Sequence, residues 1–482
     1  MKDLAILALD AASSSGASYA DIRIVESRHE EIRIRNERIE AAEAGESTGF
    51  GVRVVCDGAW GFAASRDVNR QSVKATALLA VRVAKASASA RKKDVILATA
   101  PKAMDHYKTP IVRDPFHVPL EEKLNLLFLA AKEARGVKGI KTVACRTEFW
   151  RDRKFFASTV GSLIEQDIFH SGGGIFAKAV SPDEVQHRSY PNSFGGDYRA
   201  GGYEVIEHFQ LPQNARRTAE EAVALLSAAQ CPSGTTTVVL DGTQVSLQIH
   251  ESCGHAVELD RVLGSEVNFA GTSFLTLDKL GRLQYGSPHV NITADATCPG
   301  GLGTFGYDDE GIPAFRADLV KEGLLTGYLT SRETAATLGQ ESNGTMRAEG
   351  WQNFPLIRMT NINLLPGKHS FDGLLADVED GVYMETNRSW SIDDRRVNFQ
   401  FGTEIGREIK KGKLGRLLKN PTYTGITVEF WNSCDAVGEA ALWDIWGTPN
   451  CGKGQPMQSM RTAQGAAPAR FRNVKVGVGY RT

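Results

Sequence analysis

The segment at residues 250–255 reads HESCGH and places two histidines and a glutamate close together. Imidazole nitrogens are good zinc ligands, and a carboxylate beside a ligand can act as the base for a metal-bound water. In the zinc-protease motif H-E-x-x-H the histidines lie four residues apart on one helix face, whereas His250 and His255 lie five apart. In a regular helix, at about 100° per residue, these two imidazoles would point roughly 140° away from each other.

A π-bulge would bring the two histidines together. Such a bulge inserts one residue, widens the turn to i→i+5, and is enriched at functional sites. Gly254, directly before His255, would ease the distortion. We therefore predict a bulge within Glu251–His255, with Glu251 alongside the converging imidazoles. The competing interpretation is chance, because the chain has ten histidines.

A catalytic zinc also needs a third protein ligand and an open position for water. Four side chains compete for the third position: Cys253, His289, Cys434 and Cys451. Cys253 would share a regular helix face with His250, but a bulge would rotate it away. Cys451 ranks first, because its polar, glycine-rich segment 449–456 is an unusual place for a structural thiol, and Lys453 would favour the thiolate. The other two are equally well explained as a turn histidine and a core thiol.

The composition of the chain predicts a cytoplasmic protein of more than one domain. Its 482 residues exceed one ordinary core, so we expect two or three domains. The numbers of positive and negative residues nearly balance, at 56 Lys+Arg and 57 Asp+Glu, which argues against direct nucleic-acid binding. We expect no membrane span and no secretory signal, because apolar runs are short. Seven scattered cysteines then indicate a reducing compartment without disulfides.

The hydrophobic patterns predict an α+β protein. We expect helices at residues 3–14, 68–88, 120–134 and 218–229. Alternating strands are expected at 20–25, 31–35, 49–55, 141–147, 154–159 and 163–171, with a hairpin turn at Asp57-Gly58 and another turn at 172–174. Strand clusters on both sides of a helical layer suggest an internal duplication of the first half.

A break in the pattern at Pro232-Ser233-Gly234 marks the expected domain boundary. Residues 1–232 are predicted to form an α/β domain with mixed or antiparallel sheets and long helices. Residues 233–482 are predicted to form a β-rich domain that carries the helix of the histidine motif.

Further motifs follow one another along nearly the whole chain. They are GFGVR at 49–53 with DGAWG at 57–61, HESCGH at 250–255 with Glu258 and Asp260, AGTSF at 270–274, DDEG at 308–311, LTGY at 325–328, and RMTN at 358–361 with Pro366-Gly367. In this set and order the chain resembles the TldD/PmbA family of metallopeptidases, also labelled modulators of DNA gyrase. Because it keeps the histidine motif, it resembles the catalytic TldD side.

The resemblance implies an α/β N-terminal domain and a barrel-like C-terminal domain. It implies one Zn²⁺ per chain, held by His250, His255 and Cys451, since residues 450–455 match a late family loop. It also implies a dimer, formed either with a second copy or with a paralogue that lacks the metal motif.

Together these features predict a zinc-dependent peptidase acting on unfolded, small or modified peptides. Glu251 would take a proton from the water and return it to the leaving amine. A peptide could bind as an added strand. Asp308, Asp309 and Glu310 could bind its N-terminus or form a solvated acidic turn, and Arg358 could anchor a carboxylate or form a structural ion pair. The alternative is a non-catalytic partner subunit with a structural zinc site; a nucleic-acid modulator is disfavoured by the charge balance.

Overall fold

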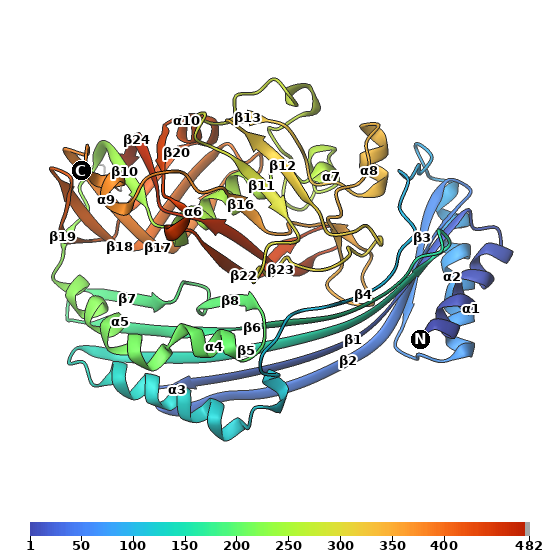
Figure 1. Cartoon of the computed structure of the whole chain (residues 1–482), viewed down its shortest axis with the longest axis horizontal. Coiled ribbons are helices and arrows are strands. Elements are labelled where there is room, and N and C mark those ends of the chain that lie inside the picture. The colour runs from blue at the N-terminus through green and yellow to red at the C-terminus, as the bar shows by residue number, and fades with distance from the viewer. Residues whose placement is uncertain (478–482) are drawn as a thin grey trace.

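The computed structural model describes residues 1–477, in which a long curved sheet supports a second, β-rich half of the chain (Figure 1). This is the α+β class that the sequence predicts, with a barrel in the C-terminal half. Within residues 1–477, no helix is both long enough and apolar enough to cross a membrane.

The long sheet contains eight strands in the order β3-β2-β1-β5-β6-β4, with β7 and β8 also paired to β6. Their bounds are β1 Tyr19–Arg35, β2 Arg38–Cys56, β3 Ala59–Ser65, β4 Met104–Lys108, β5 Ile140–Ser158, β6 Leu163–Val180, β7 Val185–Tyr190 and β8 Asp197–Ala200. The two strand clusters that suggested a duplication therefore belong to one sheet, joined where β1 pairs antiparallel with β5. The duplication itself stays a prediction.

Helices cover the two ends of this sheet (Figure 1). They are α1 Lys2–Ser14 and α2 Arg70–Ala88 at one end, and α3 Leu120–Arg135, α4 Glu204–Phe209 and α5 Leu211–Leu226 at the other, with a short 3₁₀ turn η1 at Pro115–His117. Their small apolar residues pack on the strands and form two separate cores. Three predicted helices are confirmed closely, and the fourth begins earlier than expected, at Leu211.

The strands are longer and more continuous than their sequence pattern predicted. The expected pairs of segments merge into single strands β1 and β5, and the expected turn at 172–174 is wrong, because these glycines lie inside β6. A Cβ on Gly172 would come within 2.0 Å of the Tyr198 ring, and one on Gly173 within 2.3 Å of the Arg146 carbonyl oxygen. Glycine is required here because neighbouring strands approach closely, not because the chain turns.

The C-terminal half is built on a closed barrel. Five strands form it, each paired with the next and the last with the first: β10 Gly234–Leu240, β17 Asp380–Ile392, β18 Asn398–Lys410, β20 Thr422–Ile426 and β24 Ala469–Val476. Shorter strands extend its sheet: β9 Ala229–Gln230, β19 Lys413–Lys419 and β21 Cys434–Val437. The chain thus joins this sheet at β9, close to the boundary expected at residue 232, which remains a prediction.

Smaller sheets and helices surround the barrel. The sheets are β11 Ile292–Asp295, β12 Arg316–Lys321, β13 Leu324–Leu325 and β16 Ile362–Leu364 together, β14 Met346–Arg347 with β15 Leu356–Ile357, and the hairpin of β22 Asp444–Lys453 and β23 Gln458–Ala466. The helical elements are α6 Gly242–Ile249, the π turn η2 His250–Gly254, α7 Leu259–Val262, η3 Leu277–Lys279, α8 Arg332–Thr337, α9 Phe371–Leu375, α10 Thr427–Asn432 and η4 Ala440–Leu442. The site described next lies between α6–η2 and the β22–β23 hairpin.

Candidate metal centre

Helix α6 positions the histidine motif directly after barrel strand β10. Asp241 caps the helix by accepting the Thr243 backbone N–H at 2.9 Å, and every residue of α6 is buried. The helix ends in the predicted π turn, where the His255 backbone N–H donates to the His250 carbonyl oxygen at 3.2 Å. The expectation of a widened turn is confirmed, and it brings the two imidazoles onto the same side of the helix.

Gly254 is needed for packing rather than for backbone freedom. Its conformation is not left-handed, but a Cβ at this position would lie 2.2 Å from the Met359 sulfur. Met359 is fully buried in the C-terminal core. The π turn can therefore rest on this core only because residue 254 has no side chain.

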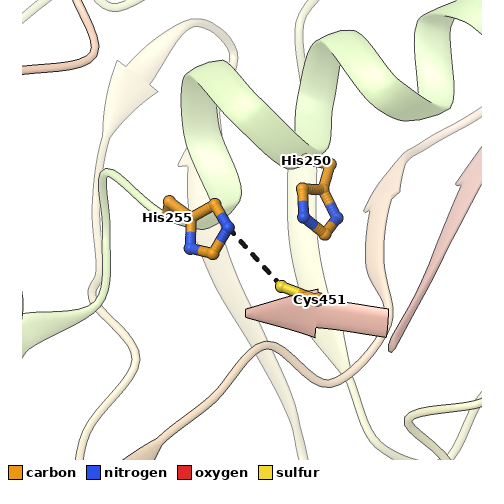
Figure 2. Close-up of side chains that lie close together, drawn as sticks. All are labelled: His250, His255 and Cys451. Atoms are coloured by element: carbon orange, nitrogen blue, oxygen red, sulfur yellow. Dashed lines mark hydrogen bonds between the residues drawn. The ribbon is translucent and has the colours of Figure 1, made fainter. Parts of the chain in front are cut away.

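Cys451 reaches the two histidines from strand β22, as Figure 2 shows. Its sulfur lies 3.5 Å from His255 Nε2, and the His250 and His255 rings lie 5.0 Å apart, nearly perpendicular at 86°. One ligand atom from each of the three residues can be chosen so that all lie within 4.8 Å of one another, and all three side chains are buried. The expected third ligand thus meets the histidine half-site.

The loop expected around Cys451 is present only in part, because Pro449 to Lys453 lie in strand β22 and the turn is confined to residues 454–457. Residues of β22 pair with β23, and the register shifts between Thr448 and Cys451, where Pro449 has no N–H to donate. A bulge of this kind redirects side chains and is common beside functional sites. Arg358 fixes the hairpin by donating to the Cys451 carbonyl oxygen at 2.5 Å and the Gln458 carbonyl oxygen at 3.1 Å. It therefore binds backbone, and it forms no ion pair with a carboxylate of residues 1–477.

The charges of the three side chains favour metal binding. Burial alone would raise the pKa of the Cys451 thiol, but His250 and His255 hold it well below its ordinary value, so the thiolate is the stable form. Burial lowers the pKa of His255 to about 4, which leaves it neutral. The pKa of His250 is raised despite burial, because the Cys451 thiolate is close. A proton shared between a thiolate and an imidazole is one that a metal ion can displace.

An unpaired atom adds independent support. His250 Nδ1 is buried and has no hydrogen-bond partner among the described residues. Buried polar atoms are rarely left unpaired unless a ligand, ion or water satisfies them. Two imidazoles and one thiolate are also a donor set that Zn²⁺ prefers, and three ligands leave a coordination position open.

A second layer of charged groups holds His255. Glu258 Oε2 lies 3.1 Å from His255 Nδ1. Lys453 in turn lies 3.4 Å from Glu258 and 2.7 Å from Asp260, and all these groups are buried or nearly so. Lys453 was expected to favour the Cys451 thiolate directly, but its ammonium group instead joins β22 to the segment after the histidine motif.

Glu251 points into the same cavity as the three candidate ligands. This cavity has a volume of about 450 Å³. Arg396 donates to Glu251 Oε2 at 2.5 Å. Burial would raise the pKa of Glu251, but His250, His255 and Arg396 together lower it, so the carboxylate is ionised at neutral pH. Sequence reasoning missed Arg396, because nothing in its local pattern distinguishes it from other surface arginines.

Two aromatic side chains wall the cavity. Phe194 comes from the N-terminal half and Trp390 from barrel strand β17, and their ring centroids lie 5.3 Å apart. Phe194 has a φ of 61°, a conformation that is costly for a bulky residue. Trp390 is 45% exposed, although it lies next to a largely buried site. Both halves of the chain thus contribute to the space in front of the candidate ligands.

The remaining candidates lie elsewhere. Cys253 and Cys434 are buried in the apolar core of the C-terminal half, and burial raises the pKa of each thiol to about 12. His289 is exposed in a turn. None of the three belongs to the group that could hold a metal, so the bulge does turn Cys253 away as expected.

The acidic segment 308–311 is neither a solvated turn nor free to bind a peptide. Asp309 lies 3.1 Å from Lys154 and 3.7 Å from Arg23, both on the long sheet. Glu310 lies 3.1 Å from Arg53 of the same sheet. Asp308 accepts backbone N–H groups. Asp309 and Glu310 thus hold the two halves together, which a single-sequence pattern does not reveal.

Comparison with known proteins agrees with this arrangement. Three family models match in succession: PmbA/TldA metallopeptidase domain 1 over residues 20–84, the central domain over 113–227 and the C-terminal domain over 233–478. The chain belongs to the PmbA/TldD family of metallopeptidases. It is 33% identical to a protein of Methanothermobacter thermautotrophicus named metalloprotease, over 95% of each chain.

Solved structures share the fold. A Thermotoga maritima protein described as a modulator of a DNA gyrase is 20% identical, with a TM-score of 0.78 over 99% of this chain and 100% of that one. TldE from Thermococcus kodakarensis is 15% identical, with a TM-score of 0.71 over 98% of this chain and 99% of that one. At these identities the likeness concerns architecture alone.

Proposed function

We propose that the protein is a zinc-dependent peptidase, with His250, His255 and Cys451 as ligands and Glu251 as the general base. The observation that carries the proposal is the convergence of three ligand atoms within 4.8 Å of one another, with Glu251 lining the same cavity. When bound, Zn²⁺ supplies Lewis acidity, which lowers the pKa of a water and polarises a carbonyl.

The side chains of this protein divide the remaining work. Glu251, kept ionised by Arg396, accepts a proton from water and later donates it to the leaving amine. Glu258 orients His255 so that Nε2, which already faces Cys451, is the nitrogen presented to the metal. Cys451 contributes a thiolate, and Arg358 fixes the position of this residue by donating to its backbone carbonyl oxygen.

The substrates we propose are unfolded, small or modified peptides. The cavity lies between the two halves and is walled by Phe194 and Trp390, so an extended chain fits better than a folded surface. We also propose a dimer, formed with a second copy or with a metal-free paralogue. The family resemblance of the sequence implies it, and the fold likeness to a protein named TldE supports it. Seven unpaired thiols are compatible with the proposed cytoplasmic location.

A structural zinc site in a non-catalytic subunit is the alternative. It would require a fourth protein ligand, and Cys253 and Cys434, the nearest candidates by sequence, lie in the apolar core instead. The ionised Glu251 would then have no chemical role.

The decisive experiment compares the wild type with Glu251→Gln. Zinc content is measured by plasma mass spectrometry, and cleavage of an unstructured peptide mixture by mass spectrometry. We expect about one zinc per chain in both proteins and loss of cleavage only in the variant. Cleavage at the wild-type rate by the variant would remove Glu251 from the mechanism, and a zinc-free, active wild type would reject the metal assignment.

A further inference from the structure

A second cavity, of about 250 Å³, lies between the long sheet and the β22–β23 hairpin. Its walls carry Arg23, Lys154 and His170 from the sheet, and Asp309, Arg347 and Arg461 from the C-terminal half. Among the described residues, none lines both this cavity and the one at the candidate metal centre. Its lining holds four cations and five carboxylates, but only Asp309 and Asp152 form ion pairs with those cations, and for this reason we call it the cationic cavity.

Arg23 and Lys154 both form an ion pair with Asp309. Neither pairs with any other carboxylate of residues 1–477. The remaining acids of the cavity wall have other partners. Asp152 pairs with Arg461, Glu148 pairs with Arg146 and His29, Asp308 accepts backbone N–H groups, and Glu349 accepts the Ser459 N–H. The charge around Asp309 is therefore incompletely balanced.

Arg347 makes the imbalance larger. Its guanidinium is buried and donates only to backbone carbonyl oxygens among the described residues: Met359 at 3.0 Å, Arg461 at 2.7 Å and Leu302 at 3.4 Å. No ion pair to a carboxylate is present for it in the described part of the chain. Burial, and then the nearby arginines, lower the pKa of Arg347 to about 9. Asp309 and Cys451 act on it only through their charge, without a direct ion pair. A buried cation that no carboxylate contacts is costly, so the position favours a bound anion.

His170 supplies an unused hydrogen-bonding group at the same place. It lies on β6, is 2% exposed, and neither of its ring nitrogens has a partner among residues 1–477. Burial, and then Arg461, Arg347 and Lys154, hold its pKa well below the ordinary value, so the ring is neutral and keeps one N–H to donate. An apolar residue of similar shape would fill this position without leaving two unsatisfied atoms.

We propose that the cationic cavity binds a small oxyanion, either a carboxylate or a phosphate. Arg347 and Lys154 would provide the positive charge, and His170 the directional N–H. Charge-assisted hydrogen bonds from arginine and lysine to such oxygens are among the strongest that proteins make. The inference is independent of the proposed peptidase activity, because the cavity contains none of the candidate metal ligands or Glu251.

The test is titration of the full-length protein, with thermal unfolding and calorimetry as readouts, at constant ionic strength maintained with chloride. One arm uses inorganic phosphate, and a second uses N-acetylglycine with its uncharged amide as the matched probe. The variants are His170→Phe and Arg347→Met, and the control is Arg316→Met, an exposed arginine of β12 outside the cavity. His170→Phe keeps the ring shape and removes no hydrogen bond within the described protein, so folding should be preserved.

We expect saturable binding of at least one oxyanion, weakened about tenfold or more in His170→Phe and Arg347→Met but unchanged in Arg316→Met. Binding of phosphate alone would identify a phosphate site. Binding of N-acetylglycine but not of its amide would identify a carboxylate site. Absence of binding above the chloride background, or equal binding by His170→Phe and the wild type, would overturn the proposal. Chelation of the metal should leave the result unchanged, which separates this proposal from the proposed peptidase function.

Discussion

Glu258 Oε2 lies 3.1 Å from His255 Nδ1, so a carboxylate occupies one ring nitrogen and leaves Nε2 directed at Cys451. We predict that Glu258→Ala lowers zinc affinity about 10–100-fold, as the loss of outer-shell partners usually does. Lys453 keeps Asp260 as a partner at 2.7 Å, so the fold should survive. Competition with a chromogenic chelator measures the affinity. Glu341→Ala, at an exposed position, is the control, and equal affinity in both variants would contradict the assigned orienting role.

The third ligand can be tested by comparing two buried cysteines, Cys451 and Cys434. Cys451→Ser should lose most of the roughly one zinc per chain, because a hydroxyl is a poor replacement for a thiolate. Cys434→Ser changes the same atoms in the apolar core, away from the candidate ligands, and should retain the metal. Metal analysis of the two purified variants decides the point. If both keep their zinc, Cys451 is not a ligand.

Trp390 should contribute to peptide binding without affecting the metal. It lines the cavity at the candidate centre, packs on Phe194 and is 45% exposed. We expect Trp390→Ala to raise KM about tenfold, because an aromatic contact surface of this size is lost, while zinc content stays at the wild-type level. Phe315→Ala, which removes another exposed aromatic ring away from this cavity, is the matched control. A change in kcat alone would point to a different role for Trp390.

The contact between the halves should depend on pH through Asp309. Burial would raise its pKa, but Lys154 and Arg23 hold the folded-state pKa below the ordinary 3.8. An acid whose pKa is depressed in the folded state stabilises the fold at pH values above its unfolded-state pKa. This stabilisation is lost as the pH falls through the folded-state pKa. We expect Asp309→Asn to cost about 3 kcal/mol at pH 7, and the difference from wild type to shrink below about pH 4.

Urea unfolding of both proteins at several pH values measures this difference. Asp183→Asn, at an exposed position, serves as the reference for removing one surface charge. A stability difference that stays constant from neutral to acidic pH would show that Asp309 does not act through its charge.

The histidine half-site could be predicted because its information is local. The spacing of His250 and His255 requires a π turn, and one is present. Arg396 could not be predicted, since it lies 145 positions from Glu251 and meets it only through the barrel strands. The role of Asp309 was also hidden, because an acidic turn looks the same in sequence whether water or a half-buried lysine faces it.

Sequence reasoning about glycines failed for a common physical reason. Glycines at 172–174 and Gly452 beside Cys451 were interpreted as parts of turns or loops, yet they lie in paired strands. In both places the absent side chain makes room for a neighbour, which is a property of the packed fold. Gly254 follows the same principle, since Met359 occupies the space that its side chain would take.

Cys451 follows His255 by 196 positions, and the barrel strands β17, β18 and β20 lie between them in sequence. During synthesis, the two histidines therefore emerge from the ribosome long before the thiolate that completes the set. If these three residues bind zinc as proposed, a growing chain would hold the metal only weakly through two imidazoles until the β22–β23 hairpin is made. In the proposed assignment, the order of the ligands along the polypeptide therefore delays completion of the centre until most of the C-terminal half has been synthesised.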